Sequence, residues 1–310
     1  MKKILVTGVS GFTGRYFVDF AGKMRPGTVR IFGVDKKCFP GSPEDFKFIK
    51  SDLLDKGKIS KIIGDIRPDY ILHLSALLFS KDHEDLLRYN VLATKNIFDA
   101  VIENGLSPRI LVIGTSGEYG ISRRNIPLKE TGPLAPITAY GLSKAAQTLL
   151  ALQYHQGSGL DIVVARPFNL IGPGQTSQLV CGSIINQIKD MGLQGSRKGR
   201  LLIGNLHTSR DFIDVRDAVR AYWMLMACKK PVAGEIFNVG SGKPHSVREI
   251  VKILSGLCGR KFSVEQRKDK VMKKDIPAQT ADITKIKALT GWKPEIPIST
   301  SLMDMYLNTP

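Results

Sequence analysis

Residues 4–14 read ILVTGVSGFTG, a short apolar run that leads directly into three closely spaced glycines. The run predicts a buried strand, and the residues after it have the periodicity of a helix. Glycines at such a turn let the backbone approach a pyrophosphate and aim helix N–H groups at it. The spacing is G-x-x-G-x-x-G, and its place between the first strand and the first helix predicts a dinucleotide-binding turn. The residues expected to contact the cofactor here are Gly8, Ser10, Gly11, Phe12, Thr13 and Gly14.

Strands and helices alternate through the first half of the chain. Apolar runs at 4–6, 29–34, 46–49, 70–74, 110–113 and 162–165 predict strands, and helical periodicity lies at 12–24, 56–66, 85–104 and 138–156. Near-continuously apolar strands that alternate with helices are typical of a parallel sheet covered on both faces. We therefore expect an α/β fold, a doubly wound parallel sheet of the Rossmann type.

The amino-acid composition changes after Arg166-Pro167, where glycine, proline, serine and glutamine become frequent up to Gly182. Beyond this loop we expect helices near 183–191, 215–228 and 247–257, strands at 201–203 and 236–239, and two short C-terminal helices. We assign residues 1–166, with 211–240, to a dinucleotide-binding domain. Residues 167–210 and 241–310 are assigned to a smaller, partly discontinuous substrate-binding domain.

Length and composition narrow the class of protein further. The 310 residues suffice for one large domain or two unequal ones, with a core that needs no disulfides. The four cysteines are scattered and the five histidines have no metal-ligand spacing, so neither a disulfide nor a metal is expected.

The N-terminal apolar run is too short for a signal peptide and no run is long enough for a membrane span, so we expect a cytoplasmic protein. The formal net charge of +17 indicates a polyanionic partner, and the basic run at 267–274 is interpreted as a solvated loop.

Asp35 ends the second predicted strand, 21 positions after Gly14. A carboxylate at this place accepts hydrogen bonds from the adenosine ribose and repels a 2′-phosphate, which favours NAD over NADP. Lys36 and Lys37 follow at once and could offset that repulsion. The cofactor is therefore expected to be NAD or NADP, with a mild preference for NAD.

Tyr140 and Lys144 are four positions apart in a predicted helix, which puts both side chains on one face. An ammonium group beside a phenol favours the phenolate, so we expect Lys144 to lower the pKa of Tyr140 towards neutrality. Such a tyrosine donates or accepts a proton at physiological pH. Thr115 and Ser116 follow the strand at 110–113, at the carboxyl edge of the sheet where ligands bind in such folds. A hydroxyl group there can hydrogen-bond a substrate oxygen.

Further motifs follow one another nearly from end to end of the chain. From the N-terminus they are the glycine turn, Asp52-Leu53, His73-Leu74-Ser75-Ala76, Asn90 with Thr94-Lys95-Asn96, Thr115 with Tyr119-Gly120, Tyr140 with Lys144, Arg166-Pro167-Phe168-Asn169, Gly172-Pro173-Gly174, RDFIDV at 210–215 and Gly291-Trp292-Lys293-Pro294. With these motifs the sequence resembles the extended short-chain dehydrogenase/reductase family, the NAD-dependent epimerases and dehydratases. Within that family, residues 168–175, 203–217 and 221–223 are most similar to the reductases of GDP-4-keto-6-deoxy-D-mannose.

The resemblance implies a homodimeric, NAD(P)-dependent enzyme that acts on a nucleotide-diphosphate sugar. Thr115, Tyr140 and Lys144 would form its catalytic triad. The cofactor contacts beyond the glycine turn would come from Asp35, Asp52, Leu53, Leu74, Ala76, Asn90, Tyr140, Lys144 and Pro167. The substrate would be bound by Ser116, Asn169 and Arg210, of which the last two would hold the diphosphate. His73, in an apolar strand, is interpreted as a core histidine.

Two places depart from the family pattern. Sugar-nucleotide 4,6-dehydratases carry an acidic residue one or two positions after the triad hydroxyl, whereas this chain has Ser116 and Gly117 there. Glu118 is one residue further and, in an extended segment, would point differently from Gly117. Where relatives often have a diphosphate-binding arginine, this chain reads MKK at 272–274, so Lys273 or Lys274 is expected to replace it as a point charge.

These features predict NAD(P)H-dependent reduction of the C4 ketone of a nucleotide-linked 4-keto-6-deoxyhexose, with a GDP-linked sugar favoured and GDP-D-rhamnose as the product. The first alternative is a C4 epimerase of a nucleotide sugar, which uses the same triad and a tightly held NAD. The second is a catalytically silent family member that binds RNA, which the net charge of +17 suggests. The sequence has no interleaved aromatic and basic motif of the kind that stacks bases, so a nucleic acid is not the expected partner.

Overall fold

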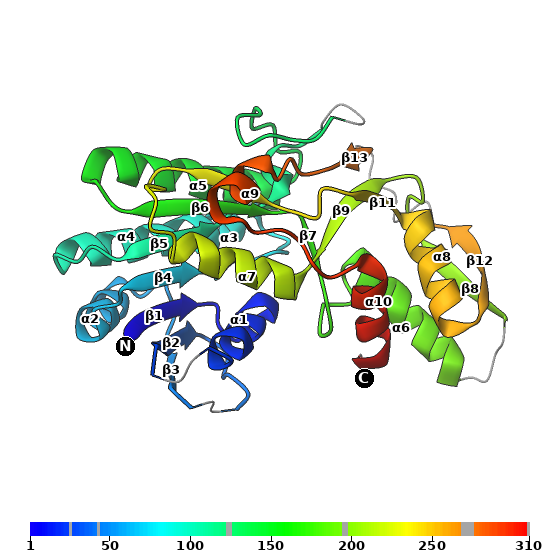
Figure 1. Ribbon diagram of the computed structural model, residues 1–310, viewed down its shortest axis with the longest axis horizontal. Coiled ribbons are helices and arrows are strands. Elements are labelled where there is room, and N and C mark those ends of the chain that lie inside the picture. Colours follow the sequence, from blue (N-terminus) through cyan, green and yellow to red (C-terminus); the bar gives the residue numbers. More distant parts are fainter. Residues whose placement is uncertain (25–26, 42–43, 122–125, 194–197, 268–275, 309–310) are drawn as a thin grey trace.

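Seven parallel strands form the central sheet, in the order β10-β6-β5-β4-β1-β2-β3 (Figure 1). The computed structural model describes residues 1–24, 27–41, 44–121, 126–193, 198–267 and 276–308. The strands of this sheet are β1 (Lys2–Thr7), β2 (Val29–Asp35), β3 (Phe46–Lys50), β4 (Tyr70–His73), β5 (Arg109–Ile113), β6 (Ile162–Pro167) and β10 (Ile236–Val239). The order reverses at β1 and β4, which is where ligands bind in doubly wound folds.

Helices cover both faces of this sheet. The helices α1 (Phe12–Gly22) and α7 (Val215–Met226) pack together on one face, and α2 (Lys56–Ile66), α4 (Ala93–Glu103) and α5 (Ala139–Ser158) cover the other. Because side chains alternate across a strand, Ile4 and Val6 enter the core below α1 and α7, while Leu5 enters the core below α2 and α4. The doubly wound Rossmann-type fold expected from the sequence is confirmed.

A second, smaller unit follows β6 (Figure 1). Its four-stranded sheet has the order β11-β9-β13, and β7 pairs with β9 on a separate path. The strands of the unit are β7 (Asn169–Ile171), β8 (Lys198–Ile203), β9 (Ser209–Asp214), β11 (Pro244–Ser246), β12 (Lys261–Gln266) and β13 (Ala278–Gln279). Its helices are α6 (Val180–Leu193), α8 (Val247–Cys258) and α10 (Ile298–Asn308), and these enclose a separate core that includes Ile185, Phe212 and Ile250.

The chain returns to the central sheet before its last helix, α10. In and after α9 (Thr284–Thr290), Ile286 and Trp292 pack into the core beside β10 and α7, and the indole N–H of Trp292 donates to the carbonyl of Asp217. The division into two domains is a proposal, and these contacts favour moving residues 284–292 from the second domain to the first. The place of β9 in the smaller sheet favours moving residues 211–214 from the first domain to the second. No local feature of the sequence marks either crossing.

The helix predicted at 85–104 is wrong in its detail. The structure has α3 (His83–Leu87), a π-helical turn η1 (Arg88–Leu92) and then α4, with the N–H of Ala93 bonded to the carbonyl of Arg88. A π turn widens the helix by one residue and often marks a functional site. Here it turns Asn90 into the protein, where the side chain is fully buried. The strands β7, β9, β11, β12 and β13 were also not predicted, since they lack a long apolar run.

The carboxylate of Asp211 ties three segments of the chain together. It is fully buried on β9, with Oδ1 accepting from the N–H and hydroxyl of Ser241 and Oδ2 accepting from the N–H groups of Gly242 and Ala281, at 2.6–3.0 Å. These bonds join β9 to the turn after β10 and to the segment before α9. An amide at this position would turn an N–H donor towards backbone donors.

We predict that Asp211→Asn lowers the free energy of unfolding by about 3 kcal/mol, because buried N–H groups lose their acceptor. Urea denaturation followed by circular dichroism measures the change. Asp19→Asn, an exposed change of the same chemistry on α1, is the matched control and should alter stability by less than about 0.5 kcal/mol. Equal stability of the two variants would show that the Asp211 bonds do not hold these segments.

Candidate active site

Thr115 lies directly after β5, at the carboxyl edge of the central sheet. It caps the short 3₁₀ helix η2 (Ser116–Glu118), with its Oγ1 accepting from the N–H of Gly117 at 3.2 Å. In return, Glu118 Oε1 accepts from the N–H of Thr115 at 2.8 Å. The capping box fixes the Thr115 hydroxyl, whose hydrogen remains available for a ligand.

Tyr140 and Lys144 project from the first turns of α5, which packs directly on η2. The close approach depends on Gly141, because a Cβ there would lie 2.7 Å from the carbonyl oxygen of Gly117. Thr138 caps α5, with its Oγ1 accepting from the N–H of Gly141 at 3.0 Å. The structure therefore brings the start of the helix that carries Tyr140 against the turn that begins at Thr115.

The protonation of Tyr140 differs from the expectation. Desolvation of the phenol, followed by the nearby Glu118 carboxylate, raises the pKa of Tyr140 above its ordinary value. Burial lowers the pKa of Lys144 to about 8, and the Glu118 charge opposes that change. The Lys144 ammonium donates to Gln147 Oε1, one turn further along the helix. The predicted lowering of the Tyr140 pKa towards neutrality is therefore wrong for this structure, because desolvation of the phenol outweighs other influences on it.

The Glu118 side chain is fully buried beneath the turn that begins at Thr115. Its Oε2 accepts from Nε of Arg166 on β6 at 2.8 Å, and Oε1 is bonded to the N–H of Thr115. Burial raises the pKa of Glu118, and the Arg166 guanidinium opposes this shift. Both carboxylate oxygens are thus engaged by the protein, and the side chain is not available as an acid for a substrate. At Gly117 a Cβ would meet only ordinary contacts, so no packing reason excludes a side chain there.

The glycines of the turn after β1 allow close contacts between backbone segments. Gly8 has a left-handed φ of +69°, and a Cβ there would lie 2.7 Å from the backbone of Ser75. A Cβ on Gly14 would lie 2.4 Å from the carbonyl oxygen of Val9. Gly11 precedes α1 without a side-chain cap, and Phe12 and Thr13 begin the helix, so the first N–H groups face outward at the edge of the sheet. A bare helix N-terminus beside such a turn fits a pyrophosphate.

Asp35 lies where the sequence placed it, at the end of β2 beside the glycine turn. Its Oδ2 accepts from the N–H of Ser10 and its Oδ1 from the N–H of Lys37, both at 3.0 Å, and the Ser10 hydroxyl donates to the Lys37 carbonyl. Lys36 forms an ion pair with Asp52 at 3.1 Å. Lys36 is therefore held by its own partner rather than turned towards Asp35.

The predicted adenine and nicotinamide residues are spread along the same edge. Asp52 accepts from the N–H of Leu54 after β3, and Leu53 is buried. Lys36, the partner of Asp52, also lies over the ring of Tyr89, 4.5 Å from the centroid. The other predicted contacts lie after β4, where Leu74 is half-buried and Ala76 is exposed, and at the end of β6, where Pro167 is buried.

Asn90 does not reach the surface where a cofactor could touch it. Its Oδ1 accepts from the N–H of Leu77 at 2.7 Å, and its Nδ2 donates to the carbonyl of Leu77 and to Oγ of Ser143. The Ser143 hydroxyl in turn donates to the carbonyl of Tyr140. Asn90 therefore positions the loop after β4 and the first turn of α5, which is a different role from the direct cofactor contact expected from the sequence.

Two of the three predicted substrate residues, Asn169 and Arg210, lie on neighbouring strands of the second unit. Asn169 begins β7 opposite Phe212, and its Nδ2 donates to the carbonyl of Asp211 at 3.2 Å. Arg210 on β9 donates to the carbonyls of Ser209 and Ile276. Ser116 is buried in η2. Met272, Lys273 and Lys274 lie outside the described residues.

Sequence reasoning missed Gln279 on β13. Its buried Nε2 donates to the carbonyls of Ser116 and Gly120, at 3.2 and 2.9 Å. This side chain joins the second unit to both ends of the turn after Thr115. No local signal marks it, because a glutamine in a two-residue strand has the character of a loop residue.

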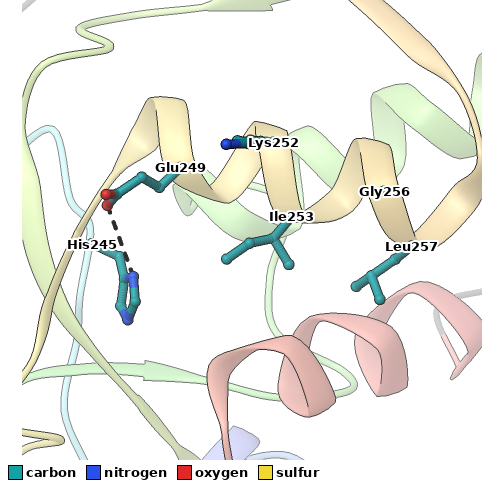
Figure 2. Close-up of a pocket in the computed structure, with 6 residues that line it drawn as sticks. All are labelled: His245, Glu249, Lys252, Ile253, Gly256 and Leu257. Carbon is teal, nitrogen blue, oxygen red and sulfur yellow. Dashed lines mark ion pairs between the residues drawn. The ribbon is translucent and has the colours of Figure 1, made fainter.

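Figure 2 shows a pocket of about 470 Å³ along α8 in the second unit, lined by His245, Glu249, Lys252, Ile253, Gly256 and Leu257. The His245 ring lies 3.8 Å from the Glu249 carboxylate. None of the residues predicted to bind cofactor or substrate lines this pocket. Within the described ranges, no three His, Cys, Asp or Glu side chains are grouped to hold a metal, and no helix is long and apolar enough to cross a membrane.

A Rossmann-type sheet with a threonine, a tyrosine and a lysine at its carboxyl edge defines an extended short-chain dehydrogenase/reductase. The family model described as GDP-mannose 4,6 dehydratase matches residues 5–305, and the chain belongs to that family.

Known relatives include both reductases and epimerases. The chain is 29% identical over 306 residues to the GDP-6-deoxy-D-mannose reductase of Pseudomonas aeruginosa, covering 97% of this chain and 95% of the relative. The structure of RMD from the same organism, complexed with NADPH, superposes with a TM-score of 0.85 at 29% identity and covers 99% and 98% of the two chains. The UDP-glucuronic acid 4-epimerase from Bacillus cereus, solved with UDP-glucuronic acid and NAD, gives a TM-score of 0.86 at 25% identity, with 98% of each chain covered.

We predict that Asp35→Ala shifts the NAD/NADP ratio of kcat/KM towards NADP by about tenfold, because a negative charge facing the 2′-phosphate is removed. The loss of the bonds to Ser10 and Lys37 should also weaken binding of both cofactors. Fluorescence titration with NADH and NADPH and steady-state kinetics measure the two effects. Glu44→Ala, which removes an exposed carboxylate before β3, should leave the ratio unchanged. An unchanged ratio in Asp35→Ala would place the ribose elsewhere.

Proposed function

We propose that this protein uses NADH or NADPH to reduce the C4 ketone of a nucleotide-linked 4-keto-6-deoxyhexose, with GDP-4-keto-6-deoxy-D-mannose as the substrate and GDP-D-rhamnose as the product. The observation that carries the proposal is the combination of a complete Thr115, Tyr140 and Lys144 set with no acid available after Thr115. Glu118 is engaged by Arg166 and by the Thr115 N–H, and Gly117 has no side chain. Elimination of water across C5 and C6 needs an acid and a base at the sugar, whereas reduction at C4 does not.

The residues fit a proton-donating role. A bound nicotinamide supplies or accepts the hydride. A raised pKa keeps Tyr140 protonated at neutral pH, as the donor to a forming alkoxide must be. Because the Thr115 Oγ1 already accepts from Gly117, its hydrogen is free to bond the same substrate oxygen. Lys144 supplies a positive charge near this centre and is expected to hold the nicotinamide ribose.

The charges on the chain support the choice of ligands. Asn169 and Arg210 lie on adjacent strands and would bind the diphosphate, which also suits the net charge of +17. NAD is the preferred cofactor in this proposal, because Lys36 is held by Asp52 and does not offset the charge of Asp35. The solved Pseudomonas relative carries NADPH, so this preference for NAD is argued from the Asp35 carboxylate and not from that relative.

The substrate assay is the first test. The protein should oxidise NADH or NADPH when given GDP-4-keto-6-deoxy-D-mannose, and it should form no 4-keto sugar from GDP-mannose with NAD or NADP. Tyr140→Phe should reduce kcat by about 10²–10⁴-fold, since the transferable proton is lost. Tyr154→Phe, the same change on the same helix at a hydroxyl that bonds Asp99, is the control. Wild-type turnover in Tyr140→Phe, or dehydration of GDP-mannose, would contradict the proposal.

A C4 epimerase is the second candidate, supported by the likeness to the 4-epimerase from Bacillus cereus. An epimerase oxidises and re-reduces one sugar within a turnover and keeps its NAD. The purified protein should therefore release its cofactor on dialysis if it is a reductase and retain NAD if it is an epimerase. Retained NAD, together with no NADH oxidation by the 4-keto sugar, would favour the epimerase.

We also propose that the partner includes a second copy of this chain. Exposed leucines lie on three elements that contact one another: Leu142 and Leu149 are seven positions apart on one face of α5, and Leu87 and Leu92 lie on α3 and η1. Large apolar side chains grouped on helices are typical of a protein interface.

We predict that Leu149→Arg converts the dimer into a monomer, because a charge would be buried in the apolar interface. Size-exclusion chromatography with light scattering measures the mass at several concentrations. Leu307→Arg on α10 introduces the same charge at another exposed leucine and should leave the mass unchanged. A wild-type protein that is monomeric at micromolar concentration would contradict the proposed dimer.

A further inference from the structure

A chain of buried polar side chains starts at Lys144 and crosses the protein to the first strand. The Lys144 ammonium donates to Gln147 Oε1, and Gln147 Nε2 donates to Oγ1 of Thr94 on α4 at 2.6 Å. Thr94 Oγ1 lies 2.8 Å from Nε2 of His73 on β4, and His73 Nδ1 lies 2.7 Å from Oγ1 of Thr7 on β1. All five side chains are at most 2% exposed. None of Gln147, Thr94 and Thr7 has a part in the proposed chemistry, so their arrangement calls for another explanation.

The hydrogen bonds of Thr94 determine which atom donates and which accepts at each step of this series of side chains. Its hydroxyl has one hydrogen, which it donates to the carbonyl of Asn90 at 2.7 Å. Thr94 Oγ1 must therefore accept from both Gln147 Nε2 and His73 Nε2. His73 Nδ1 then accepts from the Thr7 hydroxyl, which makes His73 a neutral imidazole with its proton on Nε2. Burial and the charge of Lys144 hold the pKa of His73 at about 3, so it stays neutral at physiological pH.

Because Thr94 Oγ1 acts as an acceptor, it also fixes the orientation of the Gln147 amide. Its N–H₂ group must face Thr94, which leaves the carbonyl oxygen facing Lys144. We propose that Gln147, oriented by Thr94, is a positioning residue that holds the Lys144 ammonium with an uncharged acceptor. This inference rests on the proposed function only in that Lys144 acts beside Tyr140.

An uncharged acceptor has a different effect from a carboxylate. A carboxylate at position 147 would stabilise the ammonium but cancel its charge at Tyr140, while an apolar side chain would leave a buried ammonium without its partner. The other ionisable groups around Lys144 are Tyr140 on its own helix, His73 on β4, and Glu118 on η2, which is paired with Arg166 on β6. Because His73 is neutral and Glu118 is paired, the side chain at 147 has a direct influence on the charge of Lys144.

Two substitutions at this position should move the pH profile in opposite directions. In a reduction, the alkaline limb of kcat/KM reports loss of the Lys144 charge or of the Tyr140 proton. Gln147→Glu should move this limb to higher pH by about one unit, because a nearby negative charge disfavours both losses. Gln147→Leu should move it to lower pH by a similar amount, because the ammonium loses its acceptor in a buried site.

Substitutions of Thr94 test whether its hydroxyl group orients the Gln147 amide. Thr94→Val removes the acceptor that fixes the Gln147 amide and should shift the limb in the direction of Gln147→Leu. Thr94→Ser keeps the hydroxyl and should restore the wild-type profile. The double variant Gln147→Leu/Thr94→Val should shift no further than Gln147→Leu alone, because the two residues act through one contact. Gln153→Glu, which adds the same charge at an exposed position of α5, is the control and should match the wild type.

The decisive experiment combines these kinetics with a titration of Lys144 itself. The full-length protein and its variants are labelled with [ε-¹³C]lysine, and the Lys144 resonance is assigned by its absence in Lys144→Met. The Lys144 pKa should rise in Gln147→Glu and fall in Gln147→Leu and Thr94→Val, with thermal melts showing that each variant is folded. A Lys144 pKa that shifts no more in these variants than in Gln153→Glu would overturn the assignment of Gln147. Absence of any reduction by the wild type would instead overturn the proposed function, and the titration, which needs no sugar, would still test the role of Gln147.

Discussion

The carboxylate of Glu118 lies fully buried under the turn that begins at Thr115, bonded to Arg166 on β6 and to the N–H of Thr115. Removing one partner of a buried ion pair typically costs about 3–5 kcal/mol, so this contact sets the shape of the turn. It fixes the Thr115 hydroxyl through the capping box, and its charge contributes to the raised pKa of Tyr140. The same contact removes the one carboxylate near Thr115 from the substrate side. The absence of a usable acid and the position of the triad therefore have a common structural cause.

A second buried network supports the lysine of the triad. It passes from Lys144 through Gln147, Thr94 and His73 to Thr7, directly before the glycine turn. Each side chain in it has a defined donor or acceptor role, and a satisfied network of this kind fixes a unique arrangement of its members. Tyr140 and Lys144 on α5 are thus held from two sides, by Gly141 packed on the turn after β5 and by polar contacts that reach α4, β4 and β1. His73 in this network is a neutral core histidine, as its apolar strand suggested.

Much of the first domain could be predicted from the sequence because its signals are local. The six apolar runs of the first half all form strands of the central sheet, and the glycine turn, Asp35, Thr115, Tyr140 and Lys144 lie at its carboxyl edge. The fold of the second unit was harder to predict from the sequence, because β7 and β13 are only three and two residues long and depend on contacts with β9. The inward turn of Asn90 depends on a π-helical turn, and the burial of Glu118 depends on a 3₁₀ turn and on Arg166 from a distant strand. The acceptor of the Lys144 ammonium, Gln147, depends on packing of α5 against α4, which periodicity does not describe.

The destination of the hydride tests the central claim, reduction at C4 of a 4-keto-6-deoxy sugar. The protein is incubated with GDP-4-keto-6-deoxy-D-mannose and NADH that carries deuterium at both C4 positions of the nicotinamide, and the sugar is analysed by NMR and mass spectrometry. The account predicts one deuterium, at C4 of the product, and stoichiometric formation of NAD. A product without deuterium at C4, or deuterium at another carbon, would contradict it.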